Sequence, residues 1–511
     1  MIYTEIKSSI GINRASLAAL LALGLGVAAD QLVLRQGLTG AGFLSWMVLW
    51  LTTVQLLSRS EVQPRWRYCW SVFALTAAFL LFYRSTPVLV PMMLLVLLSC
   101  GVNWLLQHRA SKHRAIAVLD YPWTTLRLPL LFLLLLWHTA GHIDPALVPR
   151  SRVRGVIKGL LMAAPILLVF ALLFASADAR FDGYLSSVSQ MFSLTAVEHL
   201  ITMTLMSVLA FGLLAMVLHK PDPGRLEVPE TLSLGREETL IIMGSLLMLF
   251  LVFVVLQAGY LFGGQDVIEQ TGGLTLADYA RRGFFEMLAV AGLTLMLLLG
   301  MSGLRCDTRF FRPLAIAMVA LVLIIMISAL QRLLLYVEAF GLTMDRLLAL
   351  GVMLWLAGSL VGFVLTVLRG RPQGFAFGSV VFGMTLLLIA GFMNPAAIVA
   401  RTNIERVVAD ADRSIDVHYL VGLGDDAIPV ILARFAELPT PVQCRFGAAA
   451  QLGWLNRSKQ TDWREWNWSR ATTLRAVEQN SEKLETIFQQ ALEDMTARVA
   501  SQTIRGIFKV C

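Results

Sequence analysis

The feature that most constrains this chain is a series of about eleven long apolar segments, which fill residues 15–394 and do not recur afterwards. A helix needs roughly 20 mainly apolar residues to cross a hydrocarbon core about 30 Å thick. Leu240–Phe262 reaches that length without a charged residue. The hydrophobic fraction of 57% exceeds the roughly 45–50% of soluble domains. We therefore expect an all-α fold, a polytopic transmembrane helix bundle of about eleven spans.

The predicted spans are Ala15–Val33, Gly42–Leu57, Trp70–Tyr83, Thr86–Leu106, Val156–Ala175, Ala196–Leu218, Leu240–Phe262, Gly283–Gly303, Pro313–Leu335, Leu347–Leu368 and Gly374–Met393. A further apolar run, Leu128–Trp137, is too short to cross at about 1.5 Å per residue and contains Pro129. We expect it to be a re-entrant or an interfacial element.

Loop charges predict the orientation. If the N-terminus is cytoplasmic and Leu128–Trp137 stays on one side, 21 Lys and Arg residues fall on the cytoplasmic side and 6 on the other. This bias alternates loop by loop, as the positive-inside rule requires. The net charge of +8 comes entirely from residues 1–394. Orientation and contact with anionic membrane lipid explain it better than nucleic-acid binding does.

The chain divides at Asn394-Pro395 into a transmembrane domain, residues 1–394, and a soluble α-helical domain, residues 395–511. Asp425 and Asp426 precede a run with Pro429, which predicts a capped helix. Ser469 is the predicted cap of a final helix that extends to Val499. The tail tryptophans are Trp454, Trp463, Trp466 and Trp468, and they suit either core packing or docking on the lipid surface. On this topology the tail is extracytoplasmic, so a Cys444–Cys511 disulfide is possible.

Ionisable residues in or near a span are candidate functional residues because burying charge in a membrane is costly. Asp278, Arg282 and Glu286 are four residues apart and share one helix face, and Arg281 adjoins them. Either they form a structural ion pair or they line a polar cavity.

Four further candidates complete the set. Asp178 and Asp182 follow the fifth predicted span, where they are either a solvated helix end or a weak cation site. Arg332 lies near the end of the ninth span and Glu338 follows it. Gly341-Leu342-Thr343 predicts a helix stop followed by a new N-cap.

The chain shows no nucleotide-binding motif and no Ser–His–Asp constellation. His138, His142 and Asp144 lack a zinc-site spacing. We therefore assign no catalytic residue, cofactor or metal, and no nucleic-acid partner.

Several strings resemble the bacterial membrane proteins catalogued as domain of unknown function 4173. They are Phe174–Asp178, Asp278–Glu286, Gly341–Thr343 with Arg346, Asn394-Pro395, Asn403–Arg406, Tyr419-Leu420 and Asp426–Pro429. The resemblance covers roughly residues 160–440. It implies a multi-span protein of the bacterial inner membrane and supplies no activity.

Three functions stay open. The first is a non-enzymatic sensing or scaffolding protein, in which the tail binds an envelope protein. The second is a transporter or channel that uses Asp278, Arg282, Glu286 and Arg332 in a hydrated path. The third is a membrane enzyme that acts on a lipid-linked substrate.

Overall fold

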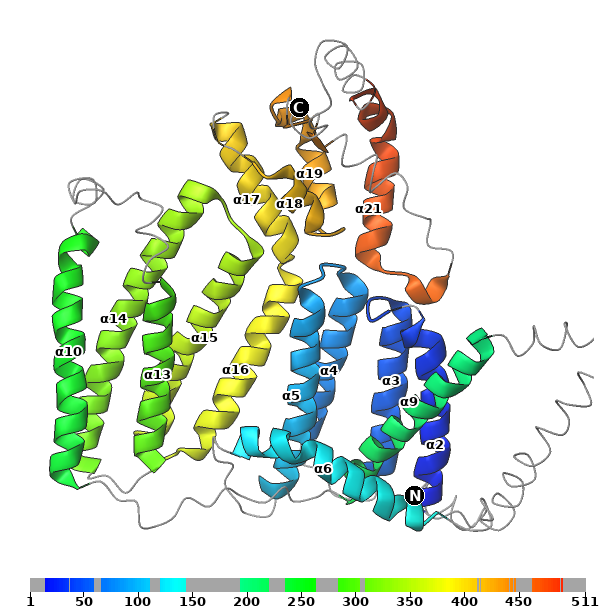
Figure 1. Cartoon of the computed structure of the whole chain (residues 1–511), viewed down its shortest axis with the longest axis horizontal. Coiled ribbons are helices and arrows are strands. Elements are labelled where there is room, and N and C mark those ends of the chain that lie inside the picture. Colours follow the sequence, from blue (N-terminus) through cyan, green and yellow to red (C-terminus); the bar gives the residue numbers. More distant parts are fainter. Residues whose placement is uncertain are drawn as a thin grey trace, which may run out of the picture.

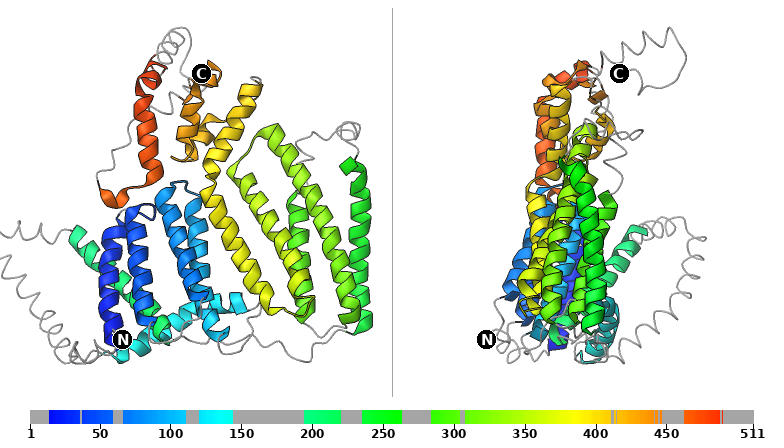
Figure 2. Two further views of the ribbon diagram at one scale, coloured as in Figure 1. Left: turned by 180° about the vertical axis from the view of Figure 1, so that it is seen from behind. Right: turned by 90° about the vertical axis from the view of Figure 1, so that its left-hand side faces the viewer.

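The computed structural model describes residues 14–35, 37–58, 66–110, 120–143, 194–219, 235–262, 284–303, 308–410, 413, 415–440, 442–443, 445–446, 462–487 and 489. Within these ranges the protein is helical and contains no strand. The membrane helices stand side by side in a broad, thin row, and the C-terminal helices lie above the upper ends of these helices (Figures 1 and 2). The all-α polytopic bundle that the sequence predicts is therefore confirmed.

The bounds of the helices in the membrane part are α2 Arg14–Ala29, the π-helix η1 Asp30–Leu34, α3 Ala41–Ser58, α4 Trp66–Tyr83, α5 Leu89–Ala110, α6 Asp120–Gly141, α9 Leu194–His219, α10 Arg236–Phe262, α13 Phe284–Gly303, α14 Thr308–Phe340, α15 Met344–Thr366 and α16 Gln373–Phe392. Among the described residues, nine helices are long and apolar enough to cross a membrane. The predicted third span lies in α4, whose apolar part, Tyr68–Tyr83, is shorter than those nine. The predicted span Val156–Ala175 lies outside the described residues.

The bundle has two halves joined by α16. One apolar core lies among α10, α13, α14 and α15, and a second lies among α3, α4, α5 and α16. On its outer faces large side chains such as Leu249 and Met296 are more than half exposed. Outward-facing leucine and methionine suit lipid tails, which are as apolar as they are.

Helix α2 packs closely on α9 through small residues. Ala18, Ala22 and Gly26 are spaced by four, and both alanines are fully buried. A Cβ on Gly26 would collide with Ser207 of α9. Small residues at this spacing let two membrane helices approach closely, so van der Waals contact holds this pair.

Helix α6 contains the short apolar run Leu128–Trp137. It lies across the lower ends of its neighbours, with Pro129 inside it (Figure 1). Leu126, Leu130 and Trp137 are largely exposed. The sequence predicts either a re-entrant or an interfacial element here. An apolar helix that crosses the end of the bundle agrees better with the interfacial one.

The C-terminal helices are α17 Pro395–Ala409, α18 Val417–Gly422, α19 Ile428–Ala433, the 3₁₀ turns η2 Phe435–Glu437 and η3 Trp463–Glu465, and α21 Trp468–Gln479. Their apolar core includes Val399, Ile404, Ile428, Ile431 and Phe446. Leu342 and Met344, from the loop between α14 and α15 and the start of α15, belong to the same core. The tail therefore shares its interior with the membrane part.

Candidate functional site

The connection between α16 and α17 turns at a single residue. Asn394 has φ +57°, the left-handed conformation that asparagine tolerates better than most residues. Its Oδ1 accepts a hydrogen bond from Ala397 N at 3.0 Å, and Pro395 follows in the first turn of α17. The membrane bundle thus continues into the tail through a fixed cap instead of a free linker.

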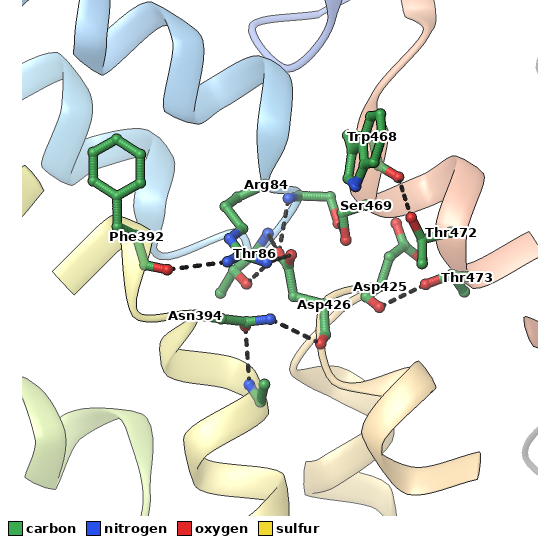
Figure 3. Close-up of polar contacts among 12 residues, drawn as sticks. Arg84, Thr86, Phe392, Asn394, Asp425, Asp426, Trp468, Ser469, Thr472 and Thr473 are labelled. Atoms are coloured by element: carbon green, nitrogen blue, oxygen red, sulfur yellow. Dashed lines mark hydrogen bonds and ion pairs between the residues drawn. The ribbon is translucent and has the colours of Figure 1, made fainter. Parts of the chain in front are cut away.

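Asp426 binds the tail to the turn between α4 and α5 (Figure 3). Its Oδ2 accepts hydrogen bonds from Ser85 N at 2.8 Å, Thr86 N at 2.7 Å and Thr86 Oγ1 at 2.6 Å. Its Oδ1 lies 3.6 Å from Arg84 Nη1. The Asp426 side chain is fully buried and that of Arg84 is 15% exposed. Hydrogen bonds to a carboxylate are stronger than those between neutral groups, so this cluster holds the tail firmly against the turn.

Asn467 makes the second link to the same turn. Its Nδ2 donates to Leu81 O at 3.1 Å and to Arg84 O at 3.0 Å, at the carboxyl end of α4. Its Oδ1 accepts from Arg470 N at 3.2 Å and so caps α21. One buried amide therefore satisfies backbone groups at the ends of two helices, one from the membrane and one from the tail.

Aromatic side chains surround this contact. The Trp466 ring lies 5.3 Å from that of Phe82, and the Trp468 ring lies 6.1 Å from that of Tyr83. These two tryptophans therefore pack on side chains at the end of a membrane helix, which is neither the core of the tail nor the lipid surface that the sequence predicts. Trp463 remains 62% exposed, as suits an aromatic ring at a membrane–water boundary.

The loop between α14 and α15 is also bound to the tail by hydrogen bonds from tail side chains to its backbone. Asn403 of α17 donates from Nδ2 to Leu342 O at 2.7 Å and accepts from Leu342 N at 3.1 Å. Arg406 Nη2 donates to the last carbonyls of α14, Glu338 O at 2.7 Å and Ala339 O at 3.0 Å. Burial, reinforced by the charges of Arg413 and Arg346, lowers the pKa of Arg406.

Tyr419 and Thr343 make the remaining hydrogen bonds that fix the α14–α15 loop. Tyr419 Oη accepts from Met344 N at 2.7 Å, and burial is the main cause that raises the pKa of this phenol. Gly341 has φ +82° and ends α14, and Thr343 caps α15. The predicted stop and cap at Gly341–Thr343 are confirmed.

A third segment, made of η1 and the loop between η1 and α3, completes the contact. Arg464 Nη1 donates to Gln31 O at 3.0 Å, and Ala41 N donates to Trp466 O at 2.9 Å. Arg470 Nη2 donates to Thr39 Oγ1 at 3.1 Å. We call the contacts of the tail with these three segments the polar junction. It fixes the tail on one end of the bundle.

A buried acid lies beside the polar junction. Asp30, in η1, is 1% exposed. It accepts from Thr202 Oγ1 at 2.6 Å and lies 2.6 Å from His199 Nδ1, both on α9. Arg35 Nε is 3.8 Å away. π-Helical turns inside α-helices often occur at functional sites, so this acid–histidine pair is a second candidate.

The residues singled out from the sequence fall in different places. Five lie outside the described residues, namely Asp178, Asp182, Asp278, Arg281 and Arg282. Glu286 is exposed in the first turn of α13, Arg332 is half-buried on α14, and Glu338 is exposed in the last turn of α14. Only Glu338 adjoins the polar junction, through its backbone carbonyl.

Two predicted caps are wrong. Ala427 stands at the N-cap of α19 without a side-chain bond, because the Asp426 carboxylate is taken by the α4–α5 turn. Pro429 does lie in the first turn of α19, as predicted. The cap of α21 is Asn467 instead of Ser469, whose hydroxyl faces Ser85 Oγ at 3.4 Å.

Histidines gather at the opposite end of the bundle. The His138 ring lies 4.6 Å from that of His142 and 5.1 Å from that of His219. No group of three His, Cys, Asp or Glu residues within the described ranges has a geometry that could hold a metal ion. Cys444 and Cys511, the predicted disulfide pair, lie outside those ranges.

The spans and the polar junction together define a polytopic, all-helical integral membrane protein. A family model described as "Domain of unknown function (DUF4153)" matches residues 47–433, so the chain belongs to that family. The resemblance to family 4173 therefore named the wrong family, although a multi-span family of unknown function agrees with it. No curated protein and no solved structure matches the chain.

The family match extends past the last span into the tail and ends at the last residue of α19. It thus includes Asn403, Arg406, Tyr419 and Asp426, four of the side chains that hold the polar junction. The sequence pointed to Asn403, Arg406 and Tyr419 only through the family resemblance, and to Asp426 also as a helix cap. Neither Asp30 nor His199 is among the residues singled out from the sequence, although an acid within an apolar span was a usable signal.

Proposed function

We propose that this integral membrane protein is a non-enzymatic sensing or scaffolding protein, in which the C-terminal helices bind a protein partner and the polar junction links them to the spans. The observation that supports this most is the Asp426 carboxylate, with three hydrogen bonds and an ion pair to the α4–α5 turn. A partner that moves the tail therefore also moves the ends of α4 and α5.

The exposed side of the tail offers the binding surface. Arg401 of α17, Trp463 of η3 and Arg475 of α21 are exposed, and the charges of residues 395–511 are balanced, with 14 basic and 14 acidic residues. A charge-balanced tail with an exposed tryptophan suits a protein partner better than nucleic acid, which binds basic surfaces.

Photo-crosslinking in the native membrane tests this proposal. A photoreactive amino acid replaces Arg401, Trp463 or Arg475 in the full chain, and Leu249, on the lipid-facing side of α10, is the control position. We expect one discrete partner from the tail positions and none from Leu249. If the polar junction fixes the tail, Asp426→Asn should reduce the amount of partner that is crosslinked to the tail. Absence of any discrete adduct at all three tail positions would reject the proposal.

A proton-coupled transporter is the second candidate, and the Asp30–His199 pair favours it. A buried acid that contacts a histidine is a common element of proton relays in membranes. In proteoliposomes with an internal pH dye, Asp30→Asn should abolish proton flux. Glu237→Gln, at an acid that is 78% exposed at the start of α10, should leave it unchanged. If the path instead includes the predicted Glu286, Glu286→Gln should abolish flux. Wild-type vesicles without flux would exclude this function.

A further inference from the structure

A groove runs between α5, α15 and α16 at the depth of the membrane spans. Its volume is about 360 Å³, near the lower end of the range for small-ligand sites. Val88, Met92, Leu95 and Ser99 line it from α5 and the turn before it, and Met344, Gly351 and Trp355 are among the residues that line it from α15. Ser99 is the single hydroxyl among the lining residues.

The groove has the length of one leaflet. Its lining extends from Met344 to Trp355 on α15, eleven steps along the helix, which at about 1.5 Å per residue give roughly 16 Å. That is about half of a hydrocarbon core about 30 Å thick. Val88, Met344 and Pro395 mark its upper end, beside the polar junction, and Ser99 and Trp355 mark its lower end.

The walls leave the groove accessible from the bilayer. Leu95 is 54% exposed and Val352 is 44% exposed, and both line it. On its floor the Trp355 indole donates to Ser379 O at 3.1 Å, which fixes the ring against Gly383 of α16. Gly351 faces open space, because a Cβ built there meets no atom within 4 Å.

We propose that this groove is a binding site for one alkyl chain of a membrane lipid, in the leaflet that adjoins the C-terminal helices. A transmembrane helix is about 10–12 Å across with its side chains and is too wide for a groove of this volume. An extended alkyl chain is narrow, apolar along its whole length and one leaflet long. It therefore matches the apolar lining, the length and the access from the bilayer that the groove shows.

Photoreactive lipid tests the site. Full-length protein in vesicles of phosphatidylethanolamine and phosphatidylglycerol, doped with phosphatidylglycerol that carries a diazirine in one acyl chain, is illuminated and digested. Labelled peptides are then identified by mass spectrometry. We expect labelling concentrated on α5, α15 and α16 at the groove residues, above that on the lipid-facing side of α10.

Two variants fill the groove from opposite walls. Gly351→Leu places a side chain in the open space, and Ser99→Leu does so from α5. Gly362→Leu is the matched control, because Gly362 lies on the same helix, also meets nothing within 4 Å, and does not line the groove. Labelling at the groove should fall about tenfold in the filling variants, which corresponds to 1.4 kcal/mol, and remain unchanged in Gly362→Leu.

Three results would overturn the proposal. One is labelling spread evenly over all lipid-facing helices, which indicates bulk lipid only. Another is unchanged groove labelling in both filling variants. The third is a crosslink at groove residues that joins two copies of the chain or another protein, which assigns the surface to a helix partner instead of a lipid.

Discussion

At the residue scale, Asp426 accepts a hydrogen bond from the Thr86 amide, which is 340 positions away in the sequence. Asp426→Asn keeps the shape but removes the charge that faces Arg84 and turns a donor toward the α4–α5 turn. Because breaking a buried ion pair from one side costs about 3–5 kcal/mol, we expect a marked fall in the thermal unfolding midpoint of the full chain in detergent.

Asp410→Asn is the control for that variant. Asp410 pairs with Arg413 at 3.3 Å, and its side chain is half exposed. Surface pairs contribute about 0–1 kcal/mol, so this midpoint should barely move. Equal shifts in the two variants would contradict the role assigned to Asp426.

Gly341 is constrained by its backbone conformation and by close contacts with α17. Its φ of +82° is strained for any residue with a side chain, and a Cβ there would collide with Asn403 Oδ1 and Arg406 Nη1. Gly341→Ala should destabilise the protein by more than the roughly 1–2 kcal/mol of left-handed strain, because the Asn403 pair must also move. Gly351→Ala, with ordinary helical backbone and open space, should be neutral or slightly stabilising.

The same measurement of unfolding by heat compares the two glycine variants. The unfolding midpoint should fall more in Gly341→Ala than in Gly351→Ala. If it does not, the contacts with α17 contribute little to the stability of the α14–α15 loop.

These residues also show where local sequence pattern succeeds and fails. Gly341 and Thr343 act on their own turn, so spacing alone predicted the helix stop and the cap. Asp426 and Asn467 act on a turn hundreds of positions away, and no local pattern contains that partner. The pattern therefore assigned Asp426 to the nearest helix, and it chose Ser469 over the true cap two residues earlier.

At the element scale, hydropathy predicted the spans well because length and apolar character alone decide whether a helix can cross. Boundaries were less accurate. The ninth span was predicted as Pro313–Leu335, whereas α14 extends to Phe340. The polar end of α14 is stabilised by Arg406 at its last carbonyls, a contact that hydropathy does not contain.

Asn467 makes α21 depend on α4. In Asn467→Asp the carboxylate still caps α21, but it can no longer donate to Leu81 O and Arg84 O, and its charge repels those carbonyls. We expect faster hydrogen–deuterium exchange both in α21 and in residues 81–86, with exchange in α13 unchanged.

Asp416→Asn is the matched control, because Asp416 caps α18 through Tyr419 N at 2.9 Å and is exposed. Its exchange effect should stay within α18. If Asn467→Asp affects α21 alone, the tail and the membrane helices are not coupled through this residue.

At the scale of the whole molecule, the C-terminal helices lie beyond one end of the membrane helices (Figure 2). Arg35, Arg84 and Arg346 lie at that end, each next to a tail-side loop. Arg309, Arg312, Arg369 and Arg371 lie at the opposite ends of α14 and α15. The fold thus separates these arginines as the loop-charge argument did.

Labelling of single cysteines decides which end faces outward. In a full chain whose five native cysteines are replaced by serine, Trp463→Cys marks the tail end, and Arg369→Cys marks the other end, beyond α15. Both native side chains are exposed, and the positive-inside rule places the arginine-rich end in the cytoplasm. A membrane-impermeant maleimide added to intact cells or spheroplasts should therefore modify the Trp463→Cys chain, but modify the Arg369→Cys chain only after lysis. Because the two positions lie at opposite ends of the bundle, we expect opposite results, and the reverse pattern would place the tail, and any partner that it binds, in the cytoplasm.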